Sequence, residues 1–261
     1  MSYFAGIDVG ASTTKAILID NNKKILGHSV LYSGADFTKA AARAFQKARK
    51  MAGRPAEEKG VVFSTGYGRR NVLFAQGTKT EISCHARGSF HHYPRAHTLI
   101  DIGGQDSKVI RIDGHGKRVG FKMNRKCAAG TGAFLEEIAN RLRIRIDRLD
   151  ELARRAKTNI TIGSYCTVFT ATEILTRIRQ NTDVEDIIRG LFDSVIKRAM
   201  EMDPLEGDIV MTGGVVAYNP FLVRMFEERL GRKIFVPPLP QLAGALGAAL
   251  FALEAKGGSH A

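Results

Sequence analysis

The sequence has few cysteines and no long apolar run. Its three cysteines, an odd number, argue against a disulfide framework and favour a reducing compartment. No apolar stretch approaches the roughly 20 residues that a transmembrane helix needs, and no charged-then-apolar leader begins the chain. Its 261 residues, with ordinary hydrophobic content, predict a soluble, cytoplasmic protein of one large domain or two lobes, without a membrane partner.

A recognised nucleic-acid-binding motif is also missing, although the formal net charge is +13. Such a charge attracts nucleic acid, an acidic lipid surface or an acidic protein, and it also favours solubility or life in a hot or salty habitat. The basic residues are scattered, and the densest segment, 141–157, is interrupted by Asp147, Asp150 and Glu151. We therefore do not expect nucleic acid as a partner.

The first third of the chain predicts strands joined by tight turns. Strands are expected at 3–9, 14–19 and 24–31, a helix at 37–51 and another strand at 61–64, before a glycine-rich loop at 65–70. At an offset of 93 residues, eight of the twenty positions from Asp8 to Gly27 are identical to those from Asp101 to Gly120. The sequence therefore contains two copies of one three-strand unit. The repeated residues of the first copy are Asp8, Gly10, Lys15, Ile17, Ile19, Asp20, Lys24 and Gly27.

Each copy ends its first strand with Asp-x-Gly. Gly10 and Gly103 lack a Cβ atom, so their backbone can approach phosphate groups, and Asp8 and Asp101 suit a magnesium ion bound through water. Two such hairpins, one from each lobe, can hold a polyphosphate, and we favour this interpretation over two structural turns. The expected nucleotide-binding residues are Gly10, Ala11, Ser12, Thr13, Thr14 and Lys15 in the first hairpin and Gly103 and Gly104 in the second.

In the second copy the most informative stretch is 124–136. Cys127 lies just before Gly130-Thr131-Gly132, and an amphipathic helical pattern follows. The free N–H groups and the dipole of a helix N-terminus favour an anion, either a phosphate or a thiolate-bound cluster. We hypothesise that this stretch holds both a nucleotide and a metal cluster, with Gly130, Thr131 and Gly132 contacting phosphate.

The rest of the second half alternates helices and short strands. Gly213, Gly214 and Val215 follow a predicted strand, and the two glycines let the backbone pass close to an adenosine. In chain order we expect an extended segment at 158–162, a helix from about 170, a helix at 184–200, a strand at 208–211, a helix from about 219, a strand at 233–236 and a last helix from about 241.

Several motifs together resemble one family. The duplicated unit and the late Thr-Gly-Gly loop resemble the actin, Hsp70 and sugar-kinase (ASKHA) fold class, an α/β fold with a duplicated βββαβα unit. Across nearly the whole chain, the motifs resemble the activator ATPases of 2-hydroxyacyl-CoA dehydratases, which are similar to the ATP-binding subunits of benzoyl-CoA reductase. These motifs are Gly6-Ile7-Asp8-Val9-Gly10, Thr65-Gly66-Tyr67-Gly68-Arg69, Ser83-Cys84-His85-Ala86, Asp101-Ile102-Gly103-Gly104-Gln105-Asp106, Lys126-Cys127-Ala128-Ala129-Gly130-Thr131-Gly132, Cys166-Thr167-Val168-Phe169 and Met211-Thr212-Gly213-Gly214-Val215.

The resemblance implies ATP or ADP between two lobes, lobe I being residues 1–95 with 242–261 and lobe II residues 96–241. It also implies an oxygen-sensitive homodimer with one [4Fe–4S] cluster, held by two cysteines from each subunit that fall here on Cys127 and Cys166. Ferredoxin or flavodoxin would supply an electron, and ATP hydrolysis would drive its delivery at very low potential to an iron–sulfur dehydratase or reductase. Which acceptor and which donor are used stays open.

The chemistry of the cysteines agrees with this implication. A [4Fe–4S] cluster usually needs four thiolates, which two cysteines from each of two chains supply. Cys127 and Cys166 both precede an expected helix, whose N-terminus stabilises thiolates. From spacing alone, however, each is more typical of a small buried apolar residue. Cys84 and His85 are too few to bind zinc, so we expect Cys84 to be buried. The loop at 65–69 is either a turn or a contact with nucleotide or partner.

ATP hydrolysis needs a positioned water and shielding of the phosphate charge. We expect Asp8 and Asp101 to organise magnesium, and Gln105, or alternatively Asp106, to orient the water. Two rival functions remain. One is a small-molecule kinase of the same fold, which would give Cys127 no role. The other is a basic nucleic-acid-binding protein with ATP as a structural ligand.

Overall fold

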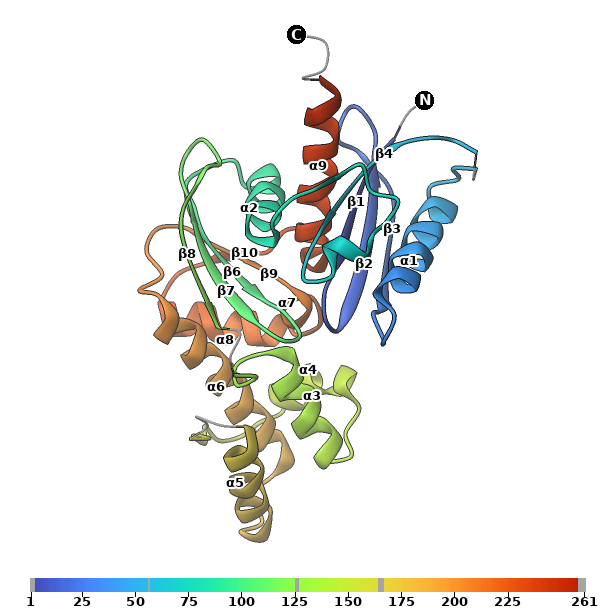
Figure 1. The fold of residues 1–261 in the computed structure, drawn as a ribbon. Helices are drawn as coiled ribbons and strands as arrows, with labels where there is room; N and C mark the ends of the chain where they lie inside the picture. Colours follow the sequence, from blue (N-terminus) through green and yellow to red (C-terminus); the bar gives the residue numbers. More distant parts are fainter. Residues whose placement is uncertain (1–2, 56, 125–126, 164–166, 258–261) are drawn as a thin grey trace. The chain divides into compact units, whose positions relative to one another are not determined.

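The computed structural model describes residues 3–55, 57–124, 127–163 and 167–257 (Figure 1). The chain divides into two compact units. Unit 1 comprises Met1–Ala96, Ile112–Val119 and Gln241–Ala261, and unit 2 comprises His97–Arg111 and Gly120–Pro240. No helix in the described ranges is long and apolar enough to cross a membrane. The lobe boundaries expected from the sequence stay a prediction.

Unit 1 is built on a five-stranded sheet in the order β3-β2-β1-β4-β5. The first three strands are antiparallel neighbours, whereas β4 runs parallel to β1 and β5 parallel to β4. The sheet therefore begins as a meander and continues through a crossover. The strands are β1 (Phe4–Val9), β2 (Thr13–Ile19), β3 (Ile25–Tyr32), β4 (Val61–Thr65) and β5 (Gly77–Thr78).

Helices cover both faces of this sheet, with α1 (Phe37–Met51) on one side and α9 (Ala243–Gly257) on the other (Figure 1). Because side chains alternate along a strand, Ala5, Ile7 and Val9 of β1 pack toward α1, whereas Phe4 packs toward α9. Gly6 also faces α9, because a Cβ atom there would collide with the backbone of Ala245. This alternation directs the side chain of Asp8 to the α9 side.

Unit 2 repeats the same topology. Its sheet has the order β10-β9-β6-β7-β8, so read from the other edge it runs through three consecutive strands and then crosses over, as in unit 1. Strand β9 is parallel to both β6 and β10. The duplication predicted from the sequence is thus present in the sheet order. The strands are β6 (His97–Ile102), β7 (Ser107–Ile112), β8 (Arg118–Asn124), β9 (Ile209–Thr212) and β10 (Ile234–Phe235).

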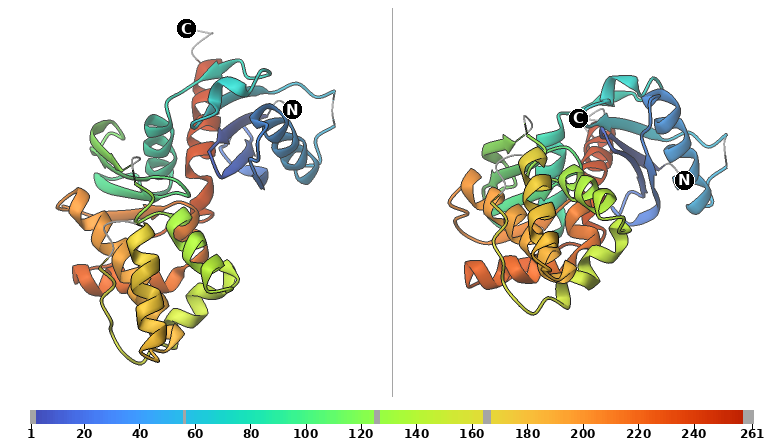
Figure 2. Two further views of the ribbon diagram at one scale, coloured as in Figure 1. Left: turned by 60° about the horizontal axis from the view of Figure 1, so that its bottom comes forward. Right: turned by 90° about the horizontal axis from the view of Figure 1, so that it is seen from below.

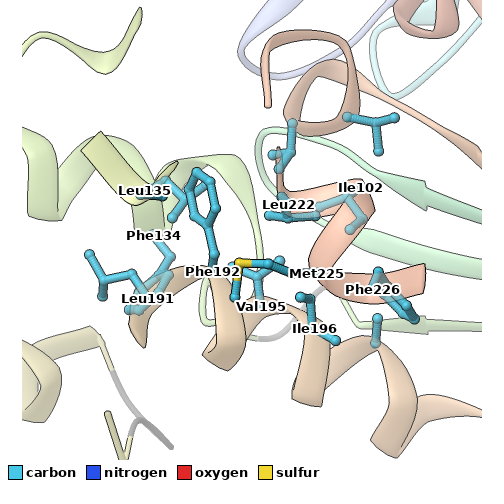
Figure 3. Packing of buried hydrophobic residues seen from close by; sticks show 14 of the residues in the cluster. Ile102, Phe134, Leu135, Leu191, Phe192, Val195, Ile196, Leu222, Met225 and Phe226 are labelled. Atoms are coloured by element: carbon cyan, nitrogen blue, oxygen red, sulfur yellow. The ribbon is translucent and has the colours of Figure 1, made fainter. Parts of the chain in front are cut away.

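The helices of unit 2 share one apolar core with β6 and β9 (Figure 3). Phe134 and Leu135 of α3 meet Phe192 of α6 and Leu222 of α8, all fully buried or nearly so. Figure 2 shows these helices packed side by side in two further views. They are α3 (Gly132–Arg141), α4 (Leu149–Arg154), α5 (Thr167–Arg179), α6 (Val184–Met202), α7 (Gly214–Tyr218) and α8 (Pro220–Leu230).

The duplicated turns agree atom by atom. The carboxylate of Asp20 accepts hydrogen bonds from the backbone of Asn22 and Lys24, at 2.8 and 2.9 Å. In the second copy the Asp113 carboxylate accepts from His115 and Lys117, both at 2.9 Å. The repeated Asp therefore forms the same side-chain-stabilised turn twice, which explains why this residue type recurs in the two copies.

Some elements of the structure were not predicted from the sequence. They are the helices α2 (Glu81–His92), α4 and α7 and the short strand β5. The segment at 158–162, which was expected to be extended, joins no sheet. Its backbone is bonded to side chains instead: Lys157 and Thr158 donate N–H groups to Asp186 of α6, at 2.8 and 3.0 Å, and Gly163 donates to Glu173 of α5. The other predicted elements are present, with ends displaced by a few residues.

Candidate functional site

The hairpin between β1 and β2 places a carboxylate and an ammonium group together in unit 1. Asp8 ends β1 directly opposite Lys15 of β2, and Lys15 Nζ lies 3.4 Å from Asp8 Oδ2. Gly10 closes the turn by donating its N–H to the Thr13 carbonyl at 3.1 Å. A Cβ atom on Gly10 would lie 2.9 Å from that carbonyl oxygen, so the turn favours glycine.

Hydroxyl groups that are buried beneath this turn hold it by hydrogen bonds. Thr14 is fully buried, and its hydroxyl shares a 2.9 Å hydrogen bond with Ser33, whose own hydroxyl donates to the Gly10 carbonyl at 2.6 Å. Ser33 was not singled out from the sequence, because it belongs to a different hairpin. Ala11 is exposed and Ser12 and Thr13 are half-buried, so these three form the accessible part of the hairpin.

The equivalent hairpin of unit 2 carries the same ion pair with two more partners. Lys108 Nζ lies 3.4 Å from Asp101 Oδ2 and 2.5 Å from Asp106 Oδ1. The hydroxyl of Thr212 donates to Asp101 Oδ1 at 2.8 Å. Both carboxylate oxygens of Asp101 are thus engaged, and Asp106 is half-buried and ion-paired, whereas Gln105 is exposed. Thr212 was missed from the sequence, although its position before Gly213-Gly214 marked the end of a strand.

The turn of this second hairpin is bonded to the start of α3. The carbonyl groups of Gly103 and Gly104 accept hydrogen bonds from the N–H groups of Gly132 and Ala133, at 2.9 and 2.7 Å. A Cβ atom on Gly132 would lie 3.1 Å from the Gly104 Cα, so this close approach depends on glycine. Two of the N–H groups of the first helical turn therefore bond to the predicted phosphate loop.

The segment that leads into α3 is also fixed by hydrogen bonds. Thr131 occupies the N-cap position of the helix, and its hydroxyl donates to the Ala128 carbonyl at 2.6 Å rather than accepting from the helix. Gly130 has a φ of +82°, and its carbonyl accepts from the Ser107 hydroxyl at 2.9 Å. Cys127 has a free, half-buried thiol at the beginning of this segment. Residues 125–126 and Cys166 lie outside the described residues.

The predicted adenosine loop joins β9 to α7 in the same unit. Gly213 has a φ of +104° and packs against the backbone of Ile102, where a Cβ atom would collide. Its N–H donates to the Pro240 carbonyl at 3.1 Å. The Val215 side chain would be 3.4 Å from a Cβ atom on Gly132, so Gly213, Gly214 and Val215 lie beside the start of α3. Unit 2 thus brings together its predicted phosphate and adenosine residues.

The densest basic segment is largely neutralised. Arg141, Arg145, Arg148, Arg154 and Lys157 each form an ion pair with a carboxylate of the same region or of Asp183. All of these pairs except Arg154–Asp150, whose carboxylate is buried, are exposed on the surface, where each contributes little to stability. They do reduce the positive field of the segment, which argues against a nucleic-acid-binding surface there.

Comparisons with known proteins find one family and several relatives over nearly the whole chain. The model of the BadF/BadG/BcrA/BcrD ATPase family matches residues 5–252. The chain is 38% identical to a 2-hydroxyisocaproyl-CoA dehydratase activator from Clostridioides difficile over 255 residues, covering 97% of this chain and 95% of the relative. It is 42% identical to the activator of lactoyl-CoA dehydratase from Anaerotignum propionicum over 256 residues, covering 97% and 98%.

Solved structures give the same result. The activator of the 2-hydroxyisocaproyl-CoA dehydratase from Clostridium difficile with bound ADPNP superimposes with a TM-score of 0.92 at 37% identity, covering 99% of this chain and 97% of that one. More distant structures, such as a ROK family glucokinase from Streptomyces griseus with a TM-score of 0.59 at 13% identity, share the fold only. The predicted actin, Hsp70 and sugar-kinase fold class is confirmed.

Proposed function

Because the chain belongs to the BadF/BadG/BcrA/BcrD ATPase family, we propose that it is an ATP-dependent electron-transfer activator. It accepts an electron from ferredoxin or flavodoxin on a [4Fe–4S] cluster shared by two copies of the chain. ATP hydrolysis then drives delivery of that electron to an iron–sulfur enzyme such as a 2-hydroxyacyl-CoA dehydratase. The relatives named as dehydratase activators, and the one solved with ADPNP, support this proposal.

The residues of unit 1 fit a magnesium nucleotide. Among the described residues, Asp8 Oδ1 is a buried oxygen atom without a hydrogen-bond partner. Magnesium prefers oxygen ligands and usually keeps several of its waters. Asp8 is therefore suited to hold a water of the hydrated ion, with Lys15 beside it as a positive charge for phosphate. When bound, magnesium would neutralise charge on the phosphate oxygens.

The cysteines fit a cluster that two chains share. Cys127 carries a half-buried free thiol, four residues before the Thr131 cap of α3. The helix dipole at this end stabilises a thiolate. One chain has three cysteines, and Cys84 is fully buried in α2, so four thiolates require a second chain. We propose Cys127 and Cys166 of each copy as the ligands.

The bonds between the second hairpin and α3 carry the proposal. The Gly103 and Gly104 carbonyls accept from Gly132 and Ala133, so a displacement of this turn moves the first turn of α3 with it. Cys127 lies on the segment just before that turn. A phosphate bound at the hairpin is therefore mechanically linked to a proposed cluster ligand by two hydrogen bonds, a short path for a nucleotide-dependent change.

The α5 helix supports an assembly of two copies. It begins immediately after Cys166, and it exposes Val168, Phe169, Leu175 and Ile178, with 65%, 73%, 65% and 41% of their surfaces accessible in the single chain. Exposed apolar side chains gathered on one helix are typical of an interface. We propose that a second copy covers this helix near the cluster.

The test is ATP-dependent activation of a dehydratase. Anaerobically prepared protein, reconstituted with iron and sulfide, is mixed with reduced ferredoxin and an inactive 2-hydroxyisocaproyl-CoA or lactoyl-CoA dehydratase. We expect dehydration with ATP and none with a non-hydrolysable analogue, and we expect Asp8→Asn to abolish the activation. Equal activation with and without ATP, or phosphorylation of a sugar in place of electron transfer, would overturn the proposal.

A further inference from the structure

Two glycines leave room for the carboxylate of Asp8 in unit 1. Gly66, with a φ of +87°, lies against Asp8 Oδ1, where a Cβ atom would collide with that oxygen. On the other side, a Cβ atom on Gly244 of α9 would lie 3.0 Å from Asp8 Oδ2. This Cβ atom on Gly244 would also lie 2.9 Å from the Nε2 atom of His85. The imidazole of α2 and the carboxylate of β1 therefore face each other across a glycine.

His85 is held in this place by its helix. Only 5% of the residue is accessible, and its Nε2 atom lies 3.9 Å from the Oε1 atom of Glu81, one turn earlier on α2. The hydroxyl of Thr80 caps this helix by accepting from the Ser83 N–H at 3.3 Å. The imidazole nitrogen thus lies between two carboxylates, Glu81 on its own helix and Asp8 across Gly244.

The hydrogen bonds of the equivalent aspartates, Asp8 and Asp101, differ between the two copies of the duplication. Asp8 is paired in register with Thr65 at the end of β4, just as Asp101 is paired with Thr212 at the end of β9. In unit 2 the threonine hydroxyl donates to Asp101 Oδ1. In unit 1 neither the Thr65 hydroxyl nor Asp8 Oδ1 has a hydrogen-bond partner among the described residues.

From this asymmetry we propose that His85, supported by Glu81, is a positioning residue that orients the Asp8 carboxylate for ATP hydrolysis. Lys15 lies 3.4 Å from Oδ2 and the imidazole faces the same carboxylate across Gly244, which leaves Oδ1 for the hydrated magnesium ion or the attacking water. Asp101, bonded through both oxygens, is the structural counterpart. The inference rests on the proposed ATPase activity, but not on the cluster or on electron transfer.

The test compares neighbouring variants of α2. For His85→Ala we expect kcat for ATP hydrolysis to fall about 10- to 100-fold, as for other partners that orient a ligand, while KM for ATP changes less than about threefold. The dissociation constant of Mn²⁺ in the ADP complex, measured by electron paramagnetic resonance, should rise about tenfold. His85→Gln, which keeps a donor, should recover most of both losses. Cys84→Ala, at the adjacent buried residue, is the matched control and should leave both unchanged.

The difference between Asp8 and Asp101 is tested separately, by comparing the Mn²⁺ affinity and the melting temperature of variants at the two positions. Asp8→Asn should weaken Mn²⁺ binding strongly, whereas Asp101→Asn should lower the melting temperature and retain Mn²⁺ binding. Equal Mn²⁺ losses in these two variants, or a wild-type kcat and Mn²⁺ affinity in His85→Ala, would overturn the inference. If the wild-type protein hydrolyses ATP but activates no dehydratase, only the electron-transfer proposal fails. If the wild-type protein hydrolyses no ATP, the proposed function fails. The role proposed for His85 is then judged by metal binding alone, and a Mn²⁺ affinity that His85→Ala leaves unchanged would reject it.

Discussion

The two described cysteines show how position determines the chemistry of a thiol. Cys84 is inaccessible in α2, where it packs against Gly247 of α9, and burial raises the pKa of its thiol to about 12. Cys127 lies in a half-buried segment at the start of α3. Cys84 was expected to be buried and is, so this thiol stays protonated and would not compete with Cys127 for the proposed cluster.

Differential alkylation checks this contrast. In the folded, iron-free protein at about pH 8, iodoacetamide should modify Cys127 and leave Cys84 unreacted, because the thiolate is the reactive form. Peptide mass spectrometry gives the extent at each site, and unfolded protein serves as the control in which Cys84 should react. Rapid modification of Cys84 in the folded protein would contradict the assignment.

The residue pairs predicted from the duplication were largely accessible to sequence reasoning. Identical residues at a fixed offset predicted that Asp8 and Asp101 occupy equivalent positions, and each lies 3.4 Å from its repeated lysine. The different bonding of Thr65 and Thr212 was not accessible, because a small change in geometry decides whether each hydroxyl reaches its carboxylate. His85 carried no periodic signal, and its neighbours Asp8 and Gly244 are distant in the sequence.

Among the elements, the segment at 157–163 shows what an expected extended segment leaves undetermined. Its β-branched residues favour extended backbone. Within unit 2, however, Ile160 and Ile162 pack against Gly190 of α6, and the Asp186 carboxylate accepts three hydrogen bonds from Lys157 and Thr158. Composition predicts an extended conformation, but it does not predict which element the segment will pack against. Here that element is the helix α6, not a neighbouring strand.

Replacing Asp186 should destabilise the protein by roughly 1–3 kcal/mol, because the N–H groups of Lys157 and Thr158 lose their acceptor. The Thr158 hydroxyl, followed by backbone N–H groups, lowers the pKa of Asp186 from its ordinary value of 3.8. A lowered pKa contributes stability above pH 3.8 that is lost as the pH falls through the folded-state value.

Urea unfolding of wild type and Asp186→Ala checks this contribution. We expect a clear difference in the free energy of unfolding at neutral pH and a smaller one near about pH 3. Asp183→Ala, whose carboxylate makes an exposed ion pair with Lys157, is the control and should have a small effect. A difference for Asp186→Ala that grows as the pH falls would be inconsistent with the argument.

The helix α2 escaped prediction for a related reason. Its sequence alternates polar and small residues without a clear apolar stripe. Gly88 of α2 and Gly247 of α9 instead allow the two backbones to approach each other, because a Cβ atom on Gly88 would collide with Ala243 and one on Gly247 with the backbone of Cys84. Close packing through small residues leaves little hydrophobic periodicity in the sequence, although it brings His85 to Asp8.

At the scale of the whole molecule, the sheet order identifies the chain as a duplicated unit with unequal halves. Within the described residues, unit 1 keeps a buried carboxylate oxygen of Asp8 without a hydrogen-bond partner, whereas unit 2 bonds its hairpin to the first turn of α3. The duplication and most elements follow from the sequence, because each copy repeats its own turn and strand pattern. The different bonding of the two hairpins was visible only in the structure.

The most direct test of this account measures iron and molecular mass on the same anaerobic sample. Sedimentation should give a dimer, and chemical analysis should find about four irons for each pair of chains. Cys127→Ala should lose the iron while still binding ATP, and Cys84→Ala should keep it. A monomer that retains a full cluster, or a Cys127→Ala variant with wild-type iron content, would contradict the claim that two chains share one centre.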